Sequence, residues 1–257
     1  MFYQLKSYLN FLLCSTNQHG VHSPFVYDLV TKCFYDTQKH QGYDMLEQHR
    51  KKLLRDTSTI SITDFGAGSR VFKSNERTVK AIAKNAGIPI KRQQLLFRLA
   101  RYFQPNNLLE LGTSLGMGTV AMATGNPNGT VTTVEGCPAT SAKAQQYFNS
   151  FGIENSTTET LTFEQFFQQH NPEVFDFVYV DGNHDKEATL RYFERLLKHI
   201  HKDSIIIFDD IYWSPEMTEA WQQIYNHPKV TVSIDTFQWG LVFFRSEQPK
   251  QHFRIRV

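Results

Sequence analysis

The chain has 257 residues, enough for one large domain or for one domain with an appendage. It is 40% hydrophobic and 20% charged, so it can bury a sizeable core, which argues against a disordered chain. Its 27 basic and 25 acidic residues leave a formal charge of +2, which is too small to direct binding to nucleic acid or to an anionic membrane. No segment repeats at a fixed period, which excludes solenoid architectures.

The N-terminal segment is apolar but does not read as a membrane or export signal. Residues 1–14 suggest a signal peptide, yet Lys6 and Asn10 interrupt the apolar stretch, so we expect an amphipathic helix. We expect the apolar face of this helix either to form a homodimer contact or to pack on the chain's own sheet. No run approaches the roughly 18 apolar residues that a bilayer requires, which predicts a soluble, cytoplasmic protein without a membrane partner.

Residues 15–90 are irregular and hold several candidate features. A basic stretch at 49–55 is interpreted as the solvated face of a helix, and residues 58–63 as a short strand. The loop 64–70 contains Asp-Phe-Gly, but a kinase would need further motifs upstream, where only 63 residues are present. We interpret this loop as a tight glycine turn, with a lid over a pocket as the alternative.

From residue 91 onward, helices and strands alternate, which predicts a parallel sheet covered on both faces. A helix is expected at 91–103, ended by Pro105, and another from Ser214. The tail predicts an antiparallel hairpin with a three-residue turn, Gln238 to Gly240. The remaining expected strands are 108–111, 130–135, 157–160, 175–180 and 204–209, and the remaining helices are 119–124, 138–150 and 185–200.

A glycine-rich loop follows the strand at 108–111. Its glycines occupy positions 1, 5 and 7 of the loop (Gly112, Gly116, Gly118), whereas a dinucleotide fold has them at 1, 3 and 6, and no Walker motif is present. Glu110 precedes the loop, where a carboxylate suits a cofactor with a cationic amine. Glu135 closes the next strand, where a carboxylate can accept hydrogen bonds from both hydroxyls of a ribose.

These five residues, in this order, resemble the S-adenosylmethionine (SAM) site of class I methyltransferases. The resemblance covers roughly residues 91–257, the expected methyltransferase domain, and implies a Rossmann-like, mostly parallel sheet with an antiparallel C-terminal hairpin. Residues 1–90 would then form a mainly helical cap or lid. The resemblance also implies that Ser114, in the glycine loop, and Leu161, after the strand at 157–160, lie near the cofactor, with loop and core roles as their alternatives.

Three acids follow two later strands and extend the resemblance. In metal-dependent O-methyltransferases of the catechol, caffeoyl-CoA and macrocin type, acids at these strand ends hold a divalent cation. The matching residues are Asp181, Asp209 and Asp210, and carboxylate oxygens suit Mg²⁺ or a similar ion. Asp181 is also expected beside the cofactor and in the catalytic centre. The alternative for Asp209 and Asp210 is that they start a turn or cap the helix from Ser214.

His184 lies where catechol-type enzymes carry a lysine that serves as general base. An imidazole can take a proton near neutral pH, so His184 is the expected base, although it departs from the family's lysine. It could instead cap the helix that starts near Asp185 or support a metal-binding carboxylate. Two further features have open roles, either closing over the acceptor or simply packing: the group His19, His22, Ser23 and Phe25, and Trp213.

The sequence therefore predicts a SAM-dependent methyltransferase that acts on an oxygen of a small molecule, assisted by a divalent cation such as Mg²⁺. One alternative is methylation of RNA or protein, with the basic stretch at 49–55 and the C-terminal residues 251–257 as a binding track. Those segments do not interleave aromatics along a basic groove, as single-strand binders do. The other alternative is a SAM-binding protein that has kept the fold without activity.

Overall fold

The computed structural model describes residues 2–63, 65, 74–169 and 174–257. The chain forms two compact units, here called unit 1 (Met1–Tyr35 with Pro172–Val257) and unit 2 (Asp36–Asn171). The predicted loop 64–70 lies outside the described residues, apart from Phe65. The domain boundary expected at residue 90 stays a prediction.

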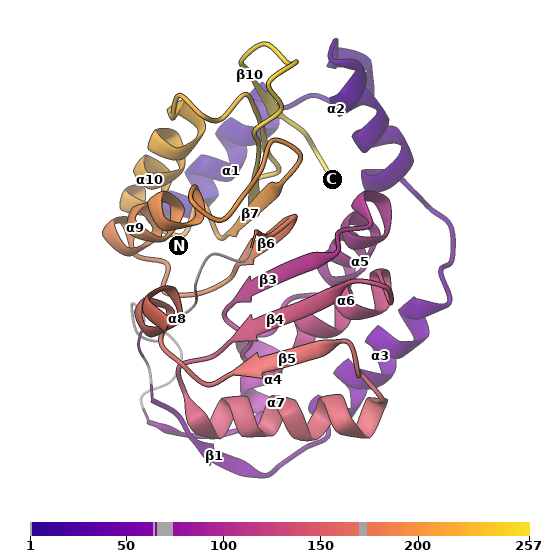
Figure 1. Ribbon diagram of the computed structural model, residues 1–257, viewed down its shortest axis with the longest axis vertical. Helices are drawn as coiled ribbons and strands as arrows, with labels where there is room; N and C mark the ends of the chain where they lie inside the picture. Colours follow the sequence, from indigo (N-terminus) through magenta and orange to yellow (C-terminus); the bar gives the residue numbers. More distant parts are fainter. Residues whose placement is uncertain (1, 64, 66–73, 170–173) are drawn as a thin grey trace. The chain divides into compact units, whose positions relative to one another are not determined.

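Unit 2 is built on three parallel strands, each of which the sequence predicts within a residue or two of its observed bounds. β3 (Asn107–Leu111) pairs with β4 (Thr130–Val134), and β4 pairs with β5 (Ser156–Glu159). In Figure 1 their arrowheads point the same way, so their carboxyl ends share one edge. The helices are α3 (Gly42–Leu53), α4 (Val79–Asn85), α5 (Ile90–Phe103), α6 (Met117–Gly125), α7 (Pro138–Phe151) and α8 (Phe163–Gln169), and a separate antiparallel pair is β1 (Thr59–Ser61) with β2 (Glu76–Thr78).

Helix α5 shows how the sequence sets an element of this unit. Its apolar side chains recur at helical spacing, and Leu96, Leu99 and Ala100 are fully buried. The helix ends at Gln104, which is left-handed, and the following Pro105 cannot continue it. The predicted helix at 91–103 is confirmed.

Unit 1 holds a mixed set of strands in the order β10-β8-β9-β7-β6. β6 (Phe177–Val180) and β7 (Ile205–Asp209) are parallel and wholly buried. β9 (Trp239–Phe243) is antiparallel to both β7 and β8 (Val232–Asp235), and β10 (Gln251–Arg254) is parallel to β8. The helical elements are α1 (Phe2–Cys14), a 3₁₀ turn (Gln18–Gly20), α2 (Pro24–Leu29), a π turn (Val30–Phe34), α9 (Lys186–Leu196) and α10 (Pro215–Asn226).

The predicted C-terminal hairpin is present, but its predicted turn was wrong. Gly240 pairs with Asp235 inside the ladder, so the turn is 236–238, and Phe237 there has a φ of 71°. Gly240 is needed for packing instead, because a Cβ at that position would lie 2.5 Å from Cζ3 of Trp221. Strand β10 was not predicted at all.

Helix α1 is the amphipathic helix that the sequence predicts. Phe11 is buried, and its ring lies 5.7 Å from that of Phe237. Phe2, Leu9 and Leu13 are exposed on the helix. In the described part of the chain, no helix combines the length and the apolar character needed to span a membrane.

Candidate functional site

The glycine-rich loop joins β3 to α6, and its backbone needs glycine at two positions. Gly112 has a φ of 110°, and Gly116, at the N-terminus of α6, has a φ of 76°. A Cβ on Gly116 would also lie 2.3 Å from Cε1 of Phe148. Ser114 adopts a left-handed conformation without being glycine, and Gly118 lies in the first turn of α6. The loop thus presents its backbone and the start of a helix at the carboxyl end of β3, where ligands of open α/β sheets bind.

Glu135 follows β4 and holds this loop in place. One carboxylate oxygen accepts a hydrogen bond from the Ser114 backbone N–H (2.9 Å), and the other accepts from the Cys137 N–H (2.9 Å). Each carboxylate oxygen has a second lone pair, so the side chain can still accept hydrogen bonds from a ribose. Glu135 is half-buried and lies at the end of a strand next to β3. The geometry fits the predicted sugar contact, which stays a prediction.

Glu110 has surroundings that the sequence did not suggest. Its side chain is only 1% exposed, and its Oε2 accepts hydrogen bonds from the hydroxyls of Thr119 and Thr133 (2.6 Å for Thr133). The carboxylate therefore ties β3 to β4 and to the first turn of α6. Its contact with the cofactor's amine stays a prediction. The two threonines were missed, because a threonine in a strand or helix carries no distinctive signal in a single sequence.

Leu161 is the last of the predicted cofactor residues in unit 2. It lies just after β5 and is half-buried. The neighbouring Thr160 hydroxyl forms a 2.6 Å hydrogen bond with that of Ser141 on α7. Unit 2 therefore gathers the glycine loop, Glu135 and Leu161 at the carboxyl edge of three adjacent parallel strands.

The three predicted metal ligands lie in unit 1, after two neighbouring parallel strands. Asp181 follows β6, Asp209 is the buried last residue of β7, and Asp210 comes next with a φ of 50°. The Asp210 carbonyl accepts a hydrogen bond from the Trp213 N–H (2.8 Å), so a turn does start here. Helix α10 is capped by Ser214 through the Met217 N–H, so the alternative that Asp209 or Asp210 caps that helix is wrong.

His184 lies next to Asp181. Its Nε2 is 3.8 Å from Oδ1 of Asp181, and both side chains are about one-quarter exposed (24% and 27%). The N-cap of α9 is Asp185, which accepts from the Ala188 N–H (2.9 Å), so the alternative that His184 caps this helix is wrong. The alternative that His184 supports the Asp181 carboxylate fits the geometry. The rings of His184 and Trp213 are 5.9 Å apart.

A divalent cation does not fit this arrangement as it stands. Within residues 2–63, 65, 74–169 and 174–257, no three histidine, cysteine, aspartate or glutamate side chains come together as a metal-binding group. A hard cation such as Mg²⁺ uses several converging oxygen ligands, so the three aspartates do not form such a centre here. The cation stays a prediction, and no chemical step is derived through it.

The remaining candidate group, near the N-terminus, has structural contacts in unit 1. His19 lies in the 3₁₀ turn and His22 after it, so the two do not share a helical face. Ser23 caps α2 and donates a hydrogen bond to Gln248 (3.2 Å). Phe25 packs edge-on against Phe243, with the ring centroids 5.0 Å apart. A role in closing over an acceptor stays a prediction.

Comparison with known proteins supports the resemblance. Residues 109–211, which run from β3 past the end of β7, match a family described as a methyltransferase domain. A catechol O-methyltransferase from Niastella koreensis is 29% identical over 118 residues, which cover 44% of this chain. The match spans about half (52%) of that relative's length.

Solved methyltransferase structures share the fold over most of the chain. One is the methyltransferase PaMTH1 of Podospora anserina, bound to S-adenosylhomocysteine (SAH). It matches with a TM-score of 0.62 and 14% identity, covering 88% of this chain and 97% of that one. The O-methyltransferase TomG of Streptomyces achromogenes, in complex with SAM, matches with a TM-score of 0.58 and 15% identity, covering 84% and 95%. The Rossmann-like methyltransferase fold and the resemblance to class I O-methyltransferases are therefore confirmed.

Proposed function

We propose that the protein is a SAM-dependent methyltransferase that transfers a methyl group to an oxygen of a small molecule. The main support is the glycine loop held by Glu135 at the carboxyl edge of β3 and β4. The methyltransferase-domain match and the catechol O-methyltransferase relative support the same reaction class. The SAM- and SAH-containing neighbours support the cofactor.

Methyl transfer from a sulfonium is a displacement with an already activated electrophile. The enzyme has to align the acceptor, which can supply roughly 7 to 11 kcal/mol, and has to remove the hydroxyl proton, which typically contributes about 10²- to 10⁴-fold. We assign the proton to Nε2 of His184. Asp181, 3.8 Å away, stabilises the imidazolium that forms.

The test of this assignment is transfer of labelled methyl from SAM to a panel of hydroxyl acceptors that includes catechol. We expect His184→Gln to lower kcat by about 10²-fold or more, with the Kd for SAM unchanged. His201→Gln is the matched control, because His201 also pairs with an aspartate (Asp176, 2.8 Å). That pair lies at the opposite edge of the sheet, where His201 precedes β7 and Asp176 precedes β6. Equal activity of the two variants would remove His184 from the mechanism.

The divalent cation is tested separately. If the predicted metal assists, excess EDTA lowers turnover and added Mg²⁺ restores it, and Asp209→Asn shows the same loss. Full turnover in EDTA would remove the cation from the proposal and leave the methyl transfer in place.

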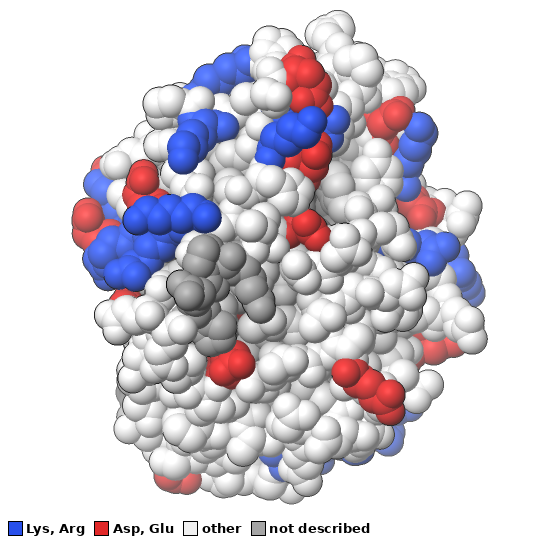
Figure 2. Space-filling view, in the orientation of Figure 1, with Lys and Arg blue, Asp and Glu red and all other residues white. Residues whose placement is uncertain are grey.

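The surface charge supports a small acceptor rather than a polyanion. Basic and acidic side chains lie among one another on the face drawn in Figure 2, and the net charge is only +2. Binding of RNA that falls steeply with salt would favour the alternative of a nucleic-acid substrate.

A further inference from the structure

A cavity of about 350 Å³ lies in unit 1, at the carboxyl end of β7. Helix α1 lines one side with Gln4, Leu5 and Tyr8. The segment after β7 contributes Tyr212 and Trp213, together with Asp210, and the 236–238 turn contributes Phe237 and Gln238. Because β9 pairs antiparallel with β7, with Trp239 opposite Asp209, this turn lies at the same edge as the acids. The cavity therefore lies at the edge where Asp209 ends β7 and Asp210 follows it, and the ring of its lining residue Trp213 lies 5.9 Å from that of His184.

The wall of the cavity is aromatic. The rings of Tyr212 and Phe237 are stacked, with centroids 4.9 Å apart and planes at 14°. Tyr8 meets Phe237 edge-on at 4.9 Å, and the Trp213 ring lies 5.9 Å from the imidazole of His184. These rings give the cavity an apolar, aromatic lining on which a flat ring can pack. Of the described residues that line the cavity, Asp210 alone is charged, so no cation there would receive an anionic group.

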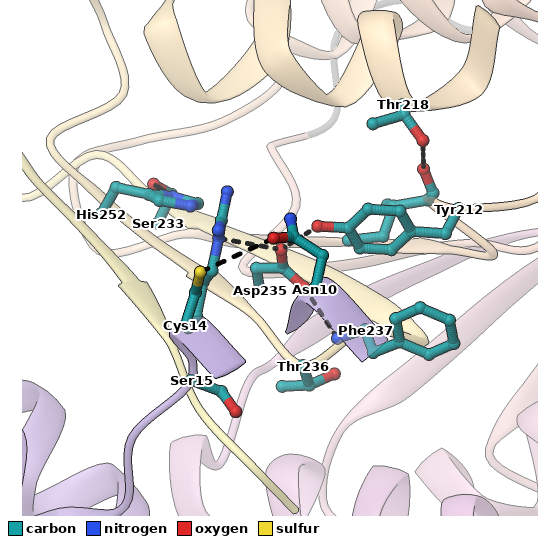
Figure 3. Close-up of polar contacts among 12 residues, drawn as sticks. Asn10, Cys14, Ser15, Tyr212, Thr218, Ser233, Asp235, Thr236, Phe237 and His252 are labelled. Carbon is teal, nitrogen blue, oxygen red and sulfur yellow. Dashed lines mark hydrogen bonds and ion pairs between the residues drawn. The ribbon is translucent and has the colours of Figure 1, made fainter. Parts of the chain in front are cut away.

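A buried carboxylate behind the wall fixes two of these rings. Asp235 is 1% exposed and does not line the cavity. As Figure 3 shows, the Tyr212 hydroxyl donates to its Oδ2 (2.6 Å) and the Phe237 backbone N–H donates to its Oδ1 (2.7 Å). Arg254 Nε lies 3.8 Å from the same carboxylate. Burial raises the pKa of Asp235, while these three partners lower it.

Phe237 needs such support because its backbone is strained. Its φ of 71° is a left-handed conformation in a non-glycine residue, which is unfavourable unless the surroundings hold it. The hydrogen bond to Asp235 and the contacts with Tyr212, Tyr8 and Phe11 hold it in place. The strain is located in the residue that connects α1 to the cavity wall.

We propose that this cavity is the acceptor pocket, and that Asp235 is a positioning residue that sets its aromatic wall. The inference rests on the methyl transfer proposed above. The pocket takes a flat, uncharged ring whose hydroxyl faces the His184 side, and α1 belongs to the acceptor site. Asp235 acts through Tyr212 and Phe237 without touching the acceptor.

The test is binding of three probes to the full chain in the presence of SAH, measured by calorimetry: catechol, 3,4-dihydroxybenzoate and cyclohexane-1,2-diol. We expect catechol to bind at least about tenfold more tightly than the benzoate, whose carboxylate meets Asp210 and no cation. The diol should also bind more weakly, because it has no flat face. No heat with catechol, or equal binding of all three probes, would overturn the pocket.

The positioning role is tested with Tyr212→Phe and Asp235→Asn. Tyr212→Phe keeps the ring and removes the hydrogen bond, so we expect about a tenfold rise in the catechol Kd and KM, with kcat and the SAH Kd unchanged. Asp235→Asn should act in the same direction. Tyr35→Phe is the matched control, because it also loses one hydrogen bond, to the Arg256 carbonyl (2.7 Å), outside the cavity. Urea unfolding establishes that each variant is folded.

The outcomes separate the pocket from the reaction. A wild-type chain that binds catechol but methylates no acceptor would refute the proposed function while the pocket stands. A chain that methylates an acceptor, but whose Tyr212→Phe and Asp235→Asn variants bind catechol as the wild type does, would refute the role of Asp235.

Discussion

One buried histidine should make folding sensitive to mild acid. His49, on α3, is 0% exposed, and its ring lies edge-on between those of Tyr147 and Phe151 (5.7 and 5.3 Å). Neither ring nitrogen has a hydrogen-bond partner among the described residues. Burial, and then the charge of Lys52, lower the pKa of His49 to about 4.

The size of the effect follows from the pKa difference between the two states. Unfolded histidine takes a proton at its ordinary value of 6.5, so between pH 6.5 and about 4 the unfolded state binds more protons than the folded state. Stability from His49 is fully present above pH 6.5 and is lost as the pH falls through this window. At about 1.4 kcal/mol per pH unit, the full loss is about 3 kcal/mol, of which about 2 kcal/mol falls between pH 7 and pH 5.

The assay is urea unfolding at pH 7 and pH 5 for the wild type and His49→Phe. The free energy of unfolding of the variant should fall by about 2 kcal/mol less than that of the wild type over this range. His252, whose pKa burial also lowers to about 4, is retained in both proteins, so the difference isolates His49. The exposed His22→Phe serves as control and should follow the wild type. Identical pH dependence in the wild type and His49→Phe would refute the reasoning.

Two further predictions concern backbone positions. Gly116→Ala should lower the free energy of unfolding by about 2 kcal/mol or more, because the new side chain combines a positive φ with a clash against Phe148. Gly152→Ala, with a φ of 66° and open space around it, should cost only about 1 kcal/mol. Equal losses in urea unfolding would contradict this reasoning. Asp185→Ala should lower the free energy of unfolding by about 1 kcal/mol, because α9 loses its N-cap, and His184→Ala should lower it much less. The reverse order in urea unfolding would show that His184 caps the helix instead.

The central strands of the sheet, such as β6 and β7, were predictable because burial on both faces leaves continuous apolar runs. Residues Ile205 to Phe208 are an example, since each is fully or almost fully buried. Strand β10 was missed for the opposite reason: Gln251 to Arg254 is a polar sequence at the edge of the sheet, and its pairing depends on β8 rather than on its own pattern. The glycine of the hairpin misled the turn prediction, because Gly240 serves the contact with Trp221.

The candidate site was predictable where it is local in sequence and hidden where it depends on distant contacts. The glycine loop and Glu135 could be picked out from their spacing after two consecutive strands and from the resemblance to class I methyltransferases. The basic stretch at 49–55 was expected to be a solvated helix face, and this prediction was wrong for His49 and Leu53. Both are buried, because they lie on the same helical face as the buried Leu46. The cavity needs α1 to meet a turn more than 200 residues away, at Phe237, and no local pattern reports that contact.

The central claim is that the loop after β3, with Glu135 behind it, holds the nucleoside cofactor. Calorimetric titration of the purified chain with SAH measures this directly, without an acceptor or a cation. We predict saturable binding in the wild type that is lost in Glu135→Ala and kept in the exposed control Glu154→Ala. A wild-type chain that gives neither heat nor a thermal shift with SAH or SAM would contradict the account.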